Sequence, residues 1–205
     1  MSPEWTARDR HLFGPGPKRM LALDAGGVRG IITVAFLERI EALLAEREGR
    51  AVRLGDWFDL IGGTSTGSMI GAALALGHAA ADLQHFYRER AASVFHRPFW
   101  RIKGLQAKFD GAVLRQEIER VVGSRTLDSE DLRTGLCIVT KRMDTGSPWI
   151  VANNPCAPYW ETPADRTFIG NRHYRLADML RASSAAPVYF DPELLPIVDG
   201  ADALA

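Results

Sequence analysis

Two short apolar runs near the start of the chain each lead into a glycine-rich stretch and then into a helical pattern. Residues 18–24 and 57–61 form these runs, and both predict buried strands because they are short, apolar and followed by turn residues. Residues 31–48 carry apolar side chains at intervals of three and four, which predicts an amphipathic helix that ends at Gly49. Residues 67–76 predict a second helix. The order strand, helix, strand, helix favours an α/β fold with parallel strands.

Helical and strand-like patterns continue along the rest of the chain. We expect three further helices, over residues 80–94, 110–122 and 176–186, and three further strands, over residues 136–140, 149–152 and 196–198. No repeat, low-complexity tract or glycine/serine linker divides these elements. A chain of 205 residues, of which 46% are hydrophobic, is long enough for one sizeable core, so we expect a single domain.

The charge balance and the two cysteines narrow the classes of function. Lys and Arg together number 25, as do Asp and Glu, so the overall charge does not favour binding to nucleic acid. Cys137 and Cys156 lack the spacing of metal ligands or of a redox pair, which favours reduced thiols and a cytoplasmic location. Residues 1–18 hold no continuous apolar stretch, so we expect an extension that is neither a signal peptide nor a membrane span.

The second glycine-rich stretch has the form of a nucleophile elbow. Gly63, Ser65 and Gly67 give the pattern Gly-x-Ser-x-Gly between the predicted strand and the predicted helix. In such an elbow the serine lies on a tight, strained turn, and the glycines avoid clashes where strand and helix approach each other. Ser65 would present its hydroxyl at the helix N-terminus, where backbone N–H groups favour negative charge. The alternative is a Gly/Ser/Thr-rich loop that only turns the chain.

The first glycine-rich stretch follows a predicted strand in the same way. Because ligands bind at the carboxyl ends of parallel strands, we expect Gly26 and Gly27 to lie near Ser65. Their N–H groups would hold the oxyanion of an acyl-transfer intermediate, where each donor contributes roughly 10²–10³ in rate. Asp24 is expected to fix this loop by binding backbone N–H groups. The alternative is a phosphate-binding loop of a nucleotide-binding module, although the Gly-Lys-Ser/Thr ending of a Walker loop is absent.

Other charged groups are candidates for the chemistry. Asp199 precedes Gly200 at the end of the last predicted strand, and an aspartate held close to Ser65 and partly desolvated can act as its base. The rival is a triad of serine, acid and histidine in that order, with His173 as the histidine. Arg29 either pairs with a nearby carboxylate to shape the glycine-rich loop or neutralises the phosphate of a lipid head group.

Aromatic and basic side chains alternate between residues 95 and 109, where Pro98 and Gly104 interrupt any long helix. Aromatic residues beside cations suit contact with a lipid–water interface. The alternative, which we prefer, is a loop that places its aromatic side chains in the core and its charges in water.

Four short blocks occur in order along the chain. They are Asp-Ala-Gly-Gly-Val-Arg-Gly at residues 24–30, Gly-Thr-Ser-Thr-Gly at 63–67, Ala-Ser-Ser-Ala-Ala-Pro-Val-Tyr-Phe at 182–190 and Asp-Gly-Ala at 199–201. Together they resemble the signatures of the patatin-like phospholipase family. The resemblance implies a three-layer α/β/α fold with a mainly parallel central sheet. It also implies a lipid acyl hydrolase that cleaves fatty-acyl esters of phospholipids or related glycerolipids through a Ser-Asp dyad, with no metal or other cofactor.

The resemblance also assigns roles to individual residues. It matches Ser65 to the nucleophile, Asp199 to the base, and Gly26, Gly27 and Val28 to the oxyanion hole. The residues that support these motifs are Asp24, Arg29, Gly30, Gly63, Gly67 and Gly200. The implied partners are a lipid ester and a membrane or micelle surface that the protein touches transiently, with no nucleic acid.

Two departures from the family pattern qualify the resemblance. Ala25 stands where most members have a glycine, and the chain ends soon after Asp199, where they normally continue. We therefore expect residues 19–205 to form an acyl hydrolase domain that lacks its C-terminal part, after the extension over residues 1–18. We expect Ala25 to change little, because the later glycines are the expected oxyanion donors, whereas the short C-terminus leaves a second function open, that of a lipid-binding or scaffold protein with the same fold and no turnover.

Overall fold

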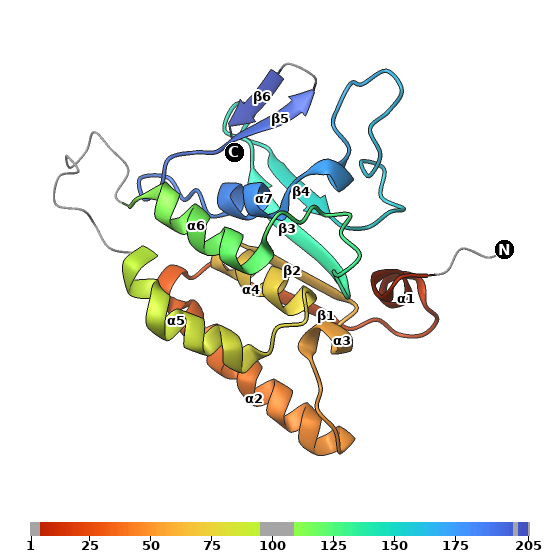
Figure 1. Ribbon diagram of the computed structural model, residues 1–205. Helices are drawn as coiled ribbons and strands as arrows, with labels where there is room; N and C mark the ends of the chain where they lie inside the picture. The colour runs from red at the N-terminus through yellow and green to blue at the C-terminus, as the bar shows by residue number, and fades with distance from the viewer. Residues whose placement is uncertain (1–4, 95–108, 199–200, 205) are drawn as a thin grey trace.

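The computed structural model describes residues 5–94, 109–198 and 201–204 (Figure 1). Its strands are β1 (Met20–Leu23), β2 (Leu60–Thr64), β3 (Gly135–Lys141), β4 (Pro148–Ala152), β5 (Leu194–Val198) and β6 (Ala201–Leu204). Its helices are α1 (Ala7–Phe13), α2 (Gly30–Glu48), α3 (Leu54–Trp57), α4 (Thr66–Ala75), α5 (Ala80–Val94), α6 (Gly111–Val122) and α7 (Leu176–Ser183), with short 3-10 turns η1 (Gly27–Arg29) and η2 (Asn171–His173).

The central sheet has four strands in the order β1-β2-β3-β4. The first three are parallel, and β4 returns antiparallel to β3. This arrangement confirms the predicted α/β fold with a mainly parallel sheet. The parallel register pairs Leu23 with Gly63, so β1 and β2 end at the same edge of the sheet. The two glycine-rich turns that follow these strands therefore start side by side.

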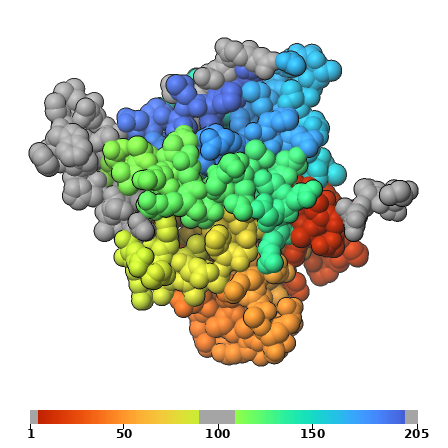
Figure 2. Space-filling model, in the orientation of Figure 1, coloured from red at the N-terminus to blue at the C-terminus, as the bar shows by residue number. Residues whose placement is uncertain are grey.

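The first layer of helices packs on the face of the sheet that carries Leu23, Ile61 and Leu136. A side chain at Gly71 of α4 would lie within 3.8 Å of all three residues, so the small residues of this helix allow it to sit close to the strands. Helix α7 packs on β3, while α6 bridges α7 and α5. Figure 2 shows α6, in green, lying above α5, in yellow-green, on one face of the molecule.

The opposite face of the sheet is covered by fewer helices. Helix α1 contacts β3, where Leu12 lies over Gly135. Elsewhere on this face Met20 is 71% exposed and Ile150 is 57% exposed. Helices thus lie on both faces of the sheet, but unequally. Among the residues that the structure describes, none of the helices is both long and apolar enough to cross a membrane.

Some boundaries differ from the predicted ones. Strand β2 begins later than predicted because residues 54–57 form the single turn α3, which the Phe58 N–H closes on the Leu54 carbonyl (3.0 Å). Helix α7 ends at Ser183 instead of residue 186. Residues 95–108 lie outside the described part of the chain, so both interpretations of this segment, the lipid contact and the preferred core-facing loop, stay predictions.

Candidate active site

The turn between β2 and α4, which we call the elbow (residues 63–67), holds Ser65 in a strained conformation. Ser65 has φ 52° and ψ −125°, a combination that side-chain-bearing residues rarely adopt. Its carbonyl accepts the N–H groups of Ser68 (3.0 Å) and Met69 (3.2 Å), which starts the helix directly behind it. Ser65 therefore stands at the N-terminus of α4, where the helix dipole favours negative charge.

The two glycines of the elbow leave no room for a side chain. A Cβ atom on Gly67 would lie 2.1 Å from the carbonyl oxygen of Leu23, and one on Gly63 would lie 2.4 Å from the carbonyl carbon of Gly67. Both clashes are with backbone, which cannot swing aside as a flexible side chain can. The backbone of the elbow is therefore closely packed between β1 and α4.

A hydrogen-bonded chain ties the elbow to the third strand. The Ser65 N–H donates to Ser183 Oγ (2.8 Å), and the Ser183 hydroxyl donates to the Val139 carbonyl (2.6 Å). Because the Ser65 amide is occupied in this way, it is not available to bind an oxyanion. Sequence reasoning placed Ser183 in a family block but gave it no role, since its partner lies 118 residues away along the chain.

The turn after β1, which we call the glycine loop (residues 25–30), lies beside the elbow. Gly27 has φ +52°, which favours glycine, and its carbonyl accepts the Thr66 hydroxyl (3.4 Å). Gly30 is buried, and a Cβ atom there would lie 2.4 Å from Thr66 Cγ2 and 2.5 Å from the Tyr87 hydroxyl. The C-terminal end of the loop is thus packed against α4 and α5, whereas Val28 is 50% exposed.

Ser65 and the glycine loop open onto the same cleft, which has a volume of about 560 Å³. We call this the catalytic cleft. It is lined by Ala25, Gly26, Gly27, Val28, Arg29, Ser65, Thr66, Met69, Phe109, Leu114, Ser184, Ala186, Tyr189 and Phe190. The structure therefore brings the predicted nucleophile together with the three residues predicted for the oxyanion hole. A serine hydroxyl, a helix N-terminus and a glycine-rich turn in one cleft can accommodate an ester carbonyl.

Aromatic side chains form another part of the cleft lining, which we call the aromatic wall. Phe109 is buried and packs against Tyr189 and Phe190, with ring centroids 5.8 and 5.5 Å apart. The Arg181 guanidinium lies 5.4 Å from the Phe190 ring and donates to the Asp191 carbonyl (2.8 Å). Burial of Arg181 lowers the pKa of its guanidinium from the usual value. This buried cation fixes the segment that carries the wall. Sequence reasoning gave these aromatic residues no role in the site, although it preferred a core position for the aromatic side chains of residues 95–109, and Phe109 is buried.

Not all of the predicted site residues come together. Asp24 is exposed, and its carboxylate makes no hydrogen bond or ion pair within the described residues, so the predicted anchoring of the loop by Asp24 is not seen. Arg29 lines the cleft, is exposed and likewise has no carboxylate partner in the described part of the chain. Asp199 and Gly200 lie outside the described residues, directly after β5.

The described residues place neither a histidine in the catalytic cleft nor a group of metal ligands together. His173, the histidine of the rival triad, is exposed on η2, and no described residue that lines the catalytic cleft is a histidine. No group of three or more His, Cys, Asp or Glu side chains is placed to hold a metal ion among the described residues.

Known proteins share both the sequence and the fold. Residues 21–203 match the profile of the family described as patatin-like phospholipase. The chain is 32% identical over 185 residues to the cGAMP-activated phospholipase of Vibrio cholerae serotype O1. This alignment covers 85% of this chain and 49% of that protein. It is also 32% identical over 181 residues to Patatin-17 of Solanum cardiophyllum. That alignment covers 84% of this chain and 43% of that protein.

A solved structure supports the same fold. VipD from Legionella pneumophila aligns with a TM-score of 0.53 and 12% sequence identity, over 93% of this chain and 46% of that one. At this identity the likeness concerns the fold alone. The chain spans about half the length of the curated relatives that it matches.

Proposed function

The chain belongs to the patatin-like phospholipase family, and from this premise we propose that it is a serine hydrolase of fatty-acyl esters in phospholipids or related glycerolipids. The observation that carries the proposal is the catalytic cleft, in which Ser65 and the glycine loop face the same space. The aromatic wall adds apolar surface to this cleft, which suits the acyl chain of an ester.

The mechanism follows from the chemistry of these groups. Ser65 Oγ bonds to the ester carbonyl carbon while its proton passes to the Asp199 carboxylate. The N–H groups of Gly26, Gly27 and Val28 hold the oxyanion, since the Ser65 N–H already donates to Ser183. Collapse of the intermediate expels the alcohol, which takes the proton from Asp199. Water then attacks the acyl-enzyme by the same steps in reverse and releases the fatty acid.

The choice of Asp199 as the base rests on the family resemblance and on its position directly after β5. An aspartate in water, with a pKa of about 3.9, is a weak base, so the proposal requires a partly desolvated carboxylate close to Ser65. The other part of the proposal is transient contact with a membrane or micelle surface by a cytoplasmic protein. The exposed guanidinium of Arg29, at the rim of the cleft, would then meet anionic head groups.

Covalent labelling tests the proposal directly. A fluorophosphonate probe is applied to the wild type, Ser65→Ala, Asp199→Asn and the control Ser147→Ala, whose serine is exposed on the turn between β3 and β4. We expect one adduct by intact mass on the wild type and on the control, none on Ser65→Ala and slow labelling of Asp199→Asn. A wild type that takes no adduct but still binds lipid vesicles would instead identify a lipid-binding protein without turnover.

A further inference from the structure

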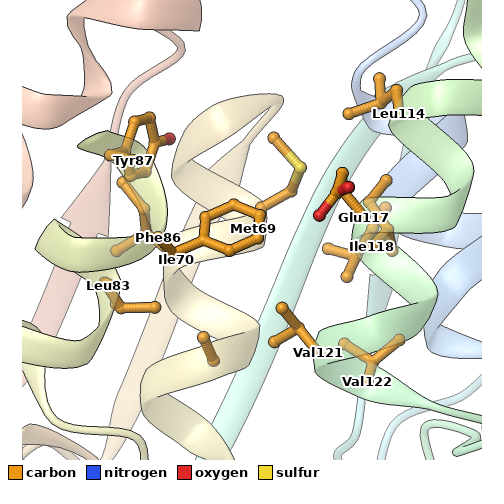
Figure 3. A pocket seen from close by; sticks show the side chains of 12 residues that line it. Met69, Ile70, Leu83, Phe86, Tyr87, Leu114, Glu117, Ile118, Val121 and Val122 are labelled. Atoms are coloured by element: carbon orange, nitrogen blue, oxygen red, sulfur yellow. The ribbon is translucent and has the colours of Figure 1, made fainter. Parts of the chain in front are cut away.

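A second pocket lies beside the catalytic cleft, between α4, α5 and α6 (Figure 3). We call it the inner cavity, and its volume is about 60 Å³. Its walls are almost entirely apolar and include Ile70, Phe86, Ile118 and Val121. Cavities with such walls are favourable environments for hydrocarbon and poor ones for water.

The inner cavity adjoins the catalytic cleft. Met69 and Leu114 line both spaces, one from α4 and the other from α6. Met69 also donates its backbone N–H to the Ser65 carbonyl (3.2 Å), so the boundary between the two spaces lies within one helical turn of the nucleophile. An acyl chain whose ester carbonyl lies at Ser65 would have to pass these two side chains to reach the inner cavity, and the flexible thioether of Met69 would adjust to it.

One charged side chain interrupts this apolar lining. Glu117 is only 5% exposed, and its Oε2 atom is buried without a hydrogen-bond partner among the described residues. Its other oxygen accepts from Arg120, whose side chain reaches toward the surface. Figure 3 shows the Glu117 carboxylate directed from α6 toward Met69, between Leu114 and Val121. A buried acceptor left unpaired destabilises the protein, and a ligand that donates to Oε2 would remove this cost.

The spacing along α6 places this carboxylate inside the path of the chain. Leu114, Glu117, Ile118 and Val121 lie at intervals of three and four and so share one face of the helix. Glu117 stands about 4.5 Å beyond Leu114 along the helix axis. A plain alkyl chain would cover Oε2 without pairing it, whereas a chain with a hydroxyl at this depth would donate to it.

We propose that the inner cavity binds the acyl chain of the substrate and that Glu117 makes the site selective for chains that carry a hydroxyl group. The proposal rests on the proposed hydrolase function and adds the class of acyl chain to it. Glu117 is a specificity residue in this assignment, since its carboxylate contacts the chain and not the reacting ester.

Matched esters test the selectivity. We would measure kcat/KM for chromogenic esters of one saturated fatty acid and of analogues in which a hydroxyl is moved along the chain. The wild type should prefer one hydroxylated position by roughly ten-fold, the effect of one hydrogen bond to a charged group. Glu117→Met should lose this preference and hydrolyse the plain ester faster, and Glu117→Gln should retain part of it through its amide oxygen.

One further variant serves as a control, and another tests the cavity itself. Glu119→Met removes the same charge from the same helix outside the cavity lining and should keep the wild-type preference. Ala73→Leu fills the cavity from α4 and should slow hydrolysis of long-chain esters while leaving acetyl esters unaffected. An unchanged preference in Glu117→Met, or an unchanged chain-length dependence in Ala73→Leu, would overturn the assignment while leaving the hydrolase function intact.

A binding measurement separates this inference from the proposed function. Calorimetry with the free fatty acid and its hydroxylated analogue, on the wild type and on Glu117→Met, requires no turnover. A preference that Glu117→Met abolishes supports the assignment even if no ester is hydrolysed, in which case only the hydrolase function fails. Equal binding of the two acids by the wild type would overturn it. Circular dichroism of each variant checks that it is folded, and Glu117→Gln serves if Glu117→Met is not.

Discussion

The elbow and the glycine loop both follow parallel strands and both line the catalytic cleft, yet the protein holds them in different ways. At the elbow, backbone atoms lie so close to Gly63 and Gly67 that any side chain would overlap them. In the loop, a Cβ atom on Gly26 would lie 3.3 Å from its nearest neighbour, the Gly30 nitrogen, and Val28 is half exposed. The glycines of the elbow are thus required for packing, as is Gly30 where the loop meets α4 and α5, whereas the first part of the loop, from Gly26 to Val28, is more open.

The two turns meet two different requirements of the proposed reaction. A nucleophile must be held in one position, and close packing with a strained backbone provides this. Oxyanion donors must instead face the substrate, and an open loop provides that. Substitutions in the elbow should therefore change stability and activity together, while substitutions in the exposed part of the loop should affect activity with little change in stability.

The largest effect is expected at Ser65. Ser65→Ala removes the nucleophile and should lower kcat by about four orders of magnitude or more. Ser65→Gly should be equally inactive but more stable than Ser65→Ala by about 1 kcal/mol, because glycine adopts φ 52° without strain. Ester hydrolysis and urea unfolding measure the two quantities. Equal stability of the two variants would mean that the elbow is not strained.

The next effect contrasts one glycine from each turn. Gly67→Ala places a methyl group 2.1 Å from the Leu23 carbonyl oxygen and should cost about 3 kcal/mol or more in the free energy of unfolding. Gly26 has a negative φ, and a methyl group there would lie 3.3 Å from the Gly30 nitrogen, which is tight but not overlapping. Gly26→Ala should therefore lower the free energy of unfolding by about 1 kcal/mol or less. Thermal unfolding of both proteins makes the comparison. Similar losses would show that the two turns are equally packed.

A smaller effect is expected where the elbow is tied to β3. Ser183→Ala removes the acceptor of the Ser65 N–H and should cost about 1–2 kcal/mol in stability, because a part-buried donor is left unpaired. It should also lower kcat by roughly ten-fold as the nucleophile loses its fixed position. The control is Ser147→Ala, because Ser147 is exposed on the turn between β3 and β4 and does not line the catalytic cleft. If both variants lose the same activity, Ser183 does not position the elbow.

The sequence predicted the parts of this molecule that depend on local pattern. Apolar periodicity located the parallel strands and all described helices except α1 and α3, because burial of one face dictates the spacing of apolar residues. The spacing of glycines around Ser65, and the shared edge of two parallel strands, placed the elbow and the glycine loop together. Strand β2 was shifted because the short turn α3 has too few residues to show a period.

Contacts between distant segments could not be predicted in this way. The pairing of Ser183 with Ser65 and the facing of Glu117 into a cavity depend on how α6 and α7 pack, which no local pattern encodes. The role expected for Asp24 required a partner that the described residues do not supply. The assignment of Asp199 as the base stays a prediction, because this residue lies outside the described chain.

The smallest effect on stability is expected at Arg29, in the open loop. Its side chain is exposed and unpaired within the described residues, so Arg29→Ala should change the free energy of unfolding by less than about 0.5 kcal/mol. It should nevertheless raise KM several-fold for esters with anionic head groups, leave neutral esters unaffected, and lose this difference in high salt, which screens exposed charges. Arg47→Ala, which removes an exposed cation from α2, should leave both substrates unchanged. Equal losses on charged and neutral esters would assign Arg29 to the shape of the loop instead of to the head group, and the loop would then resemble the elbow more than its exposure suggests.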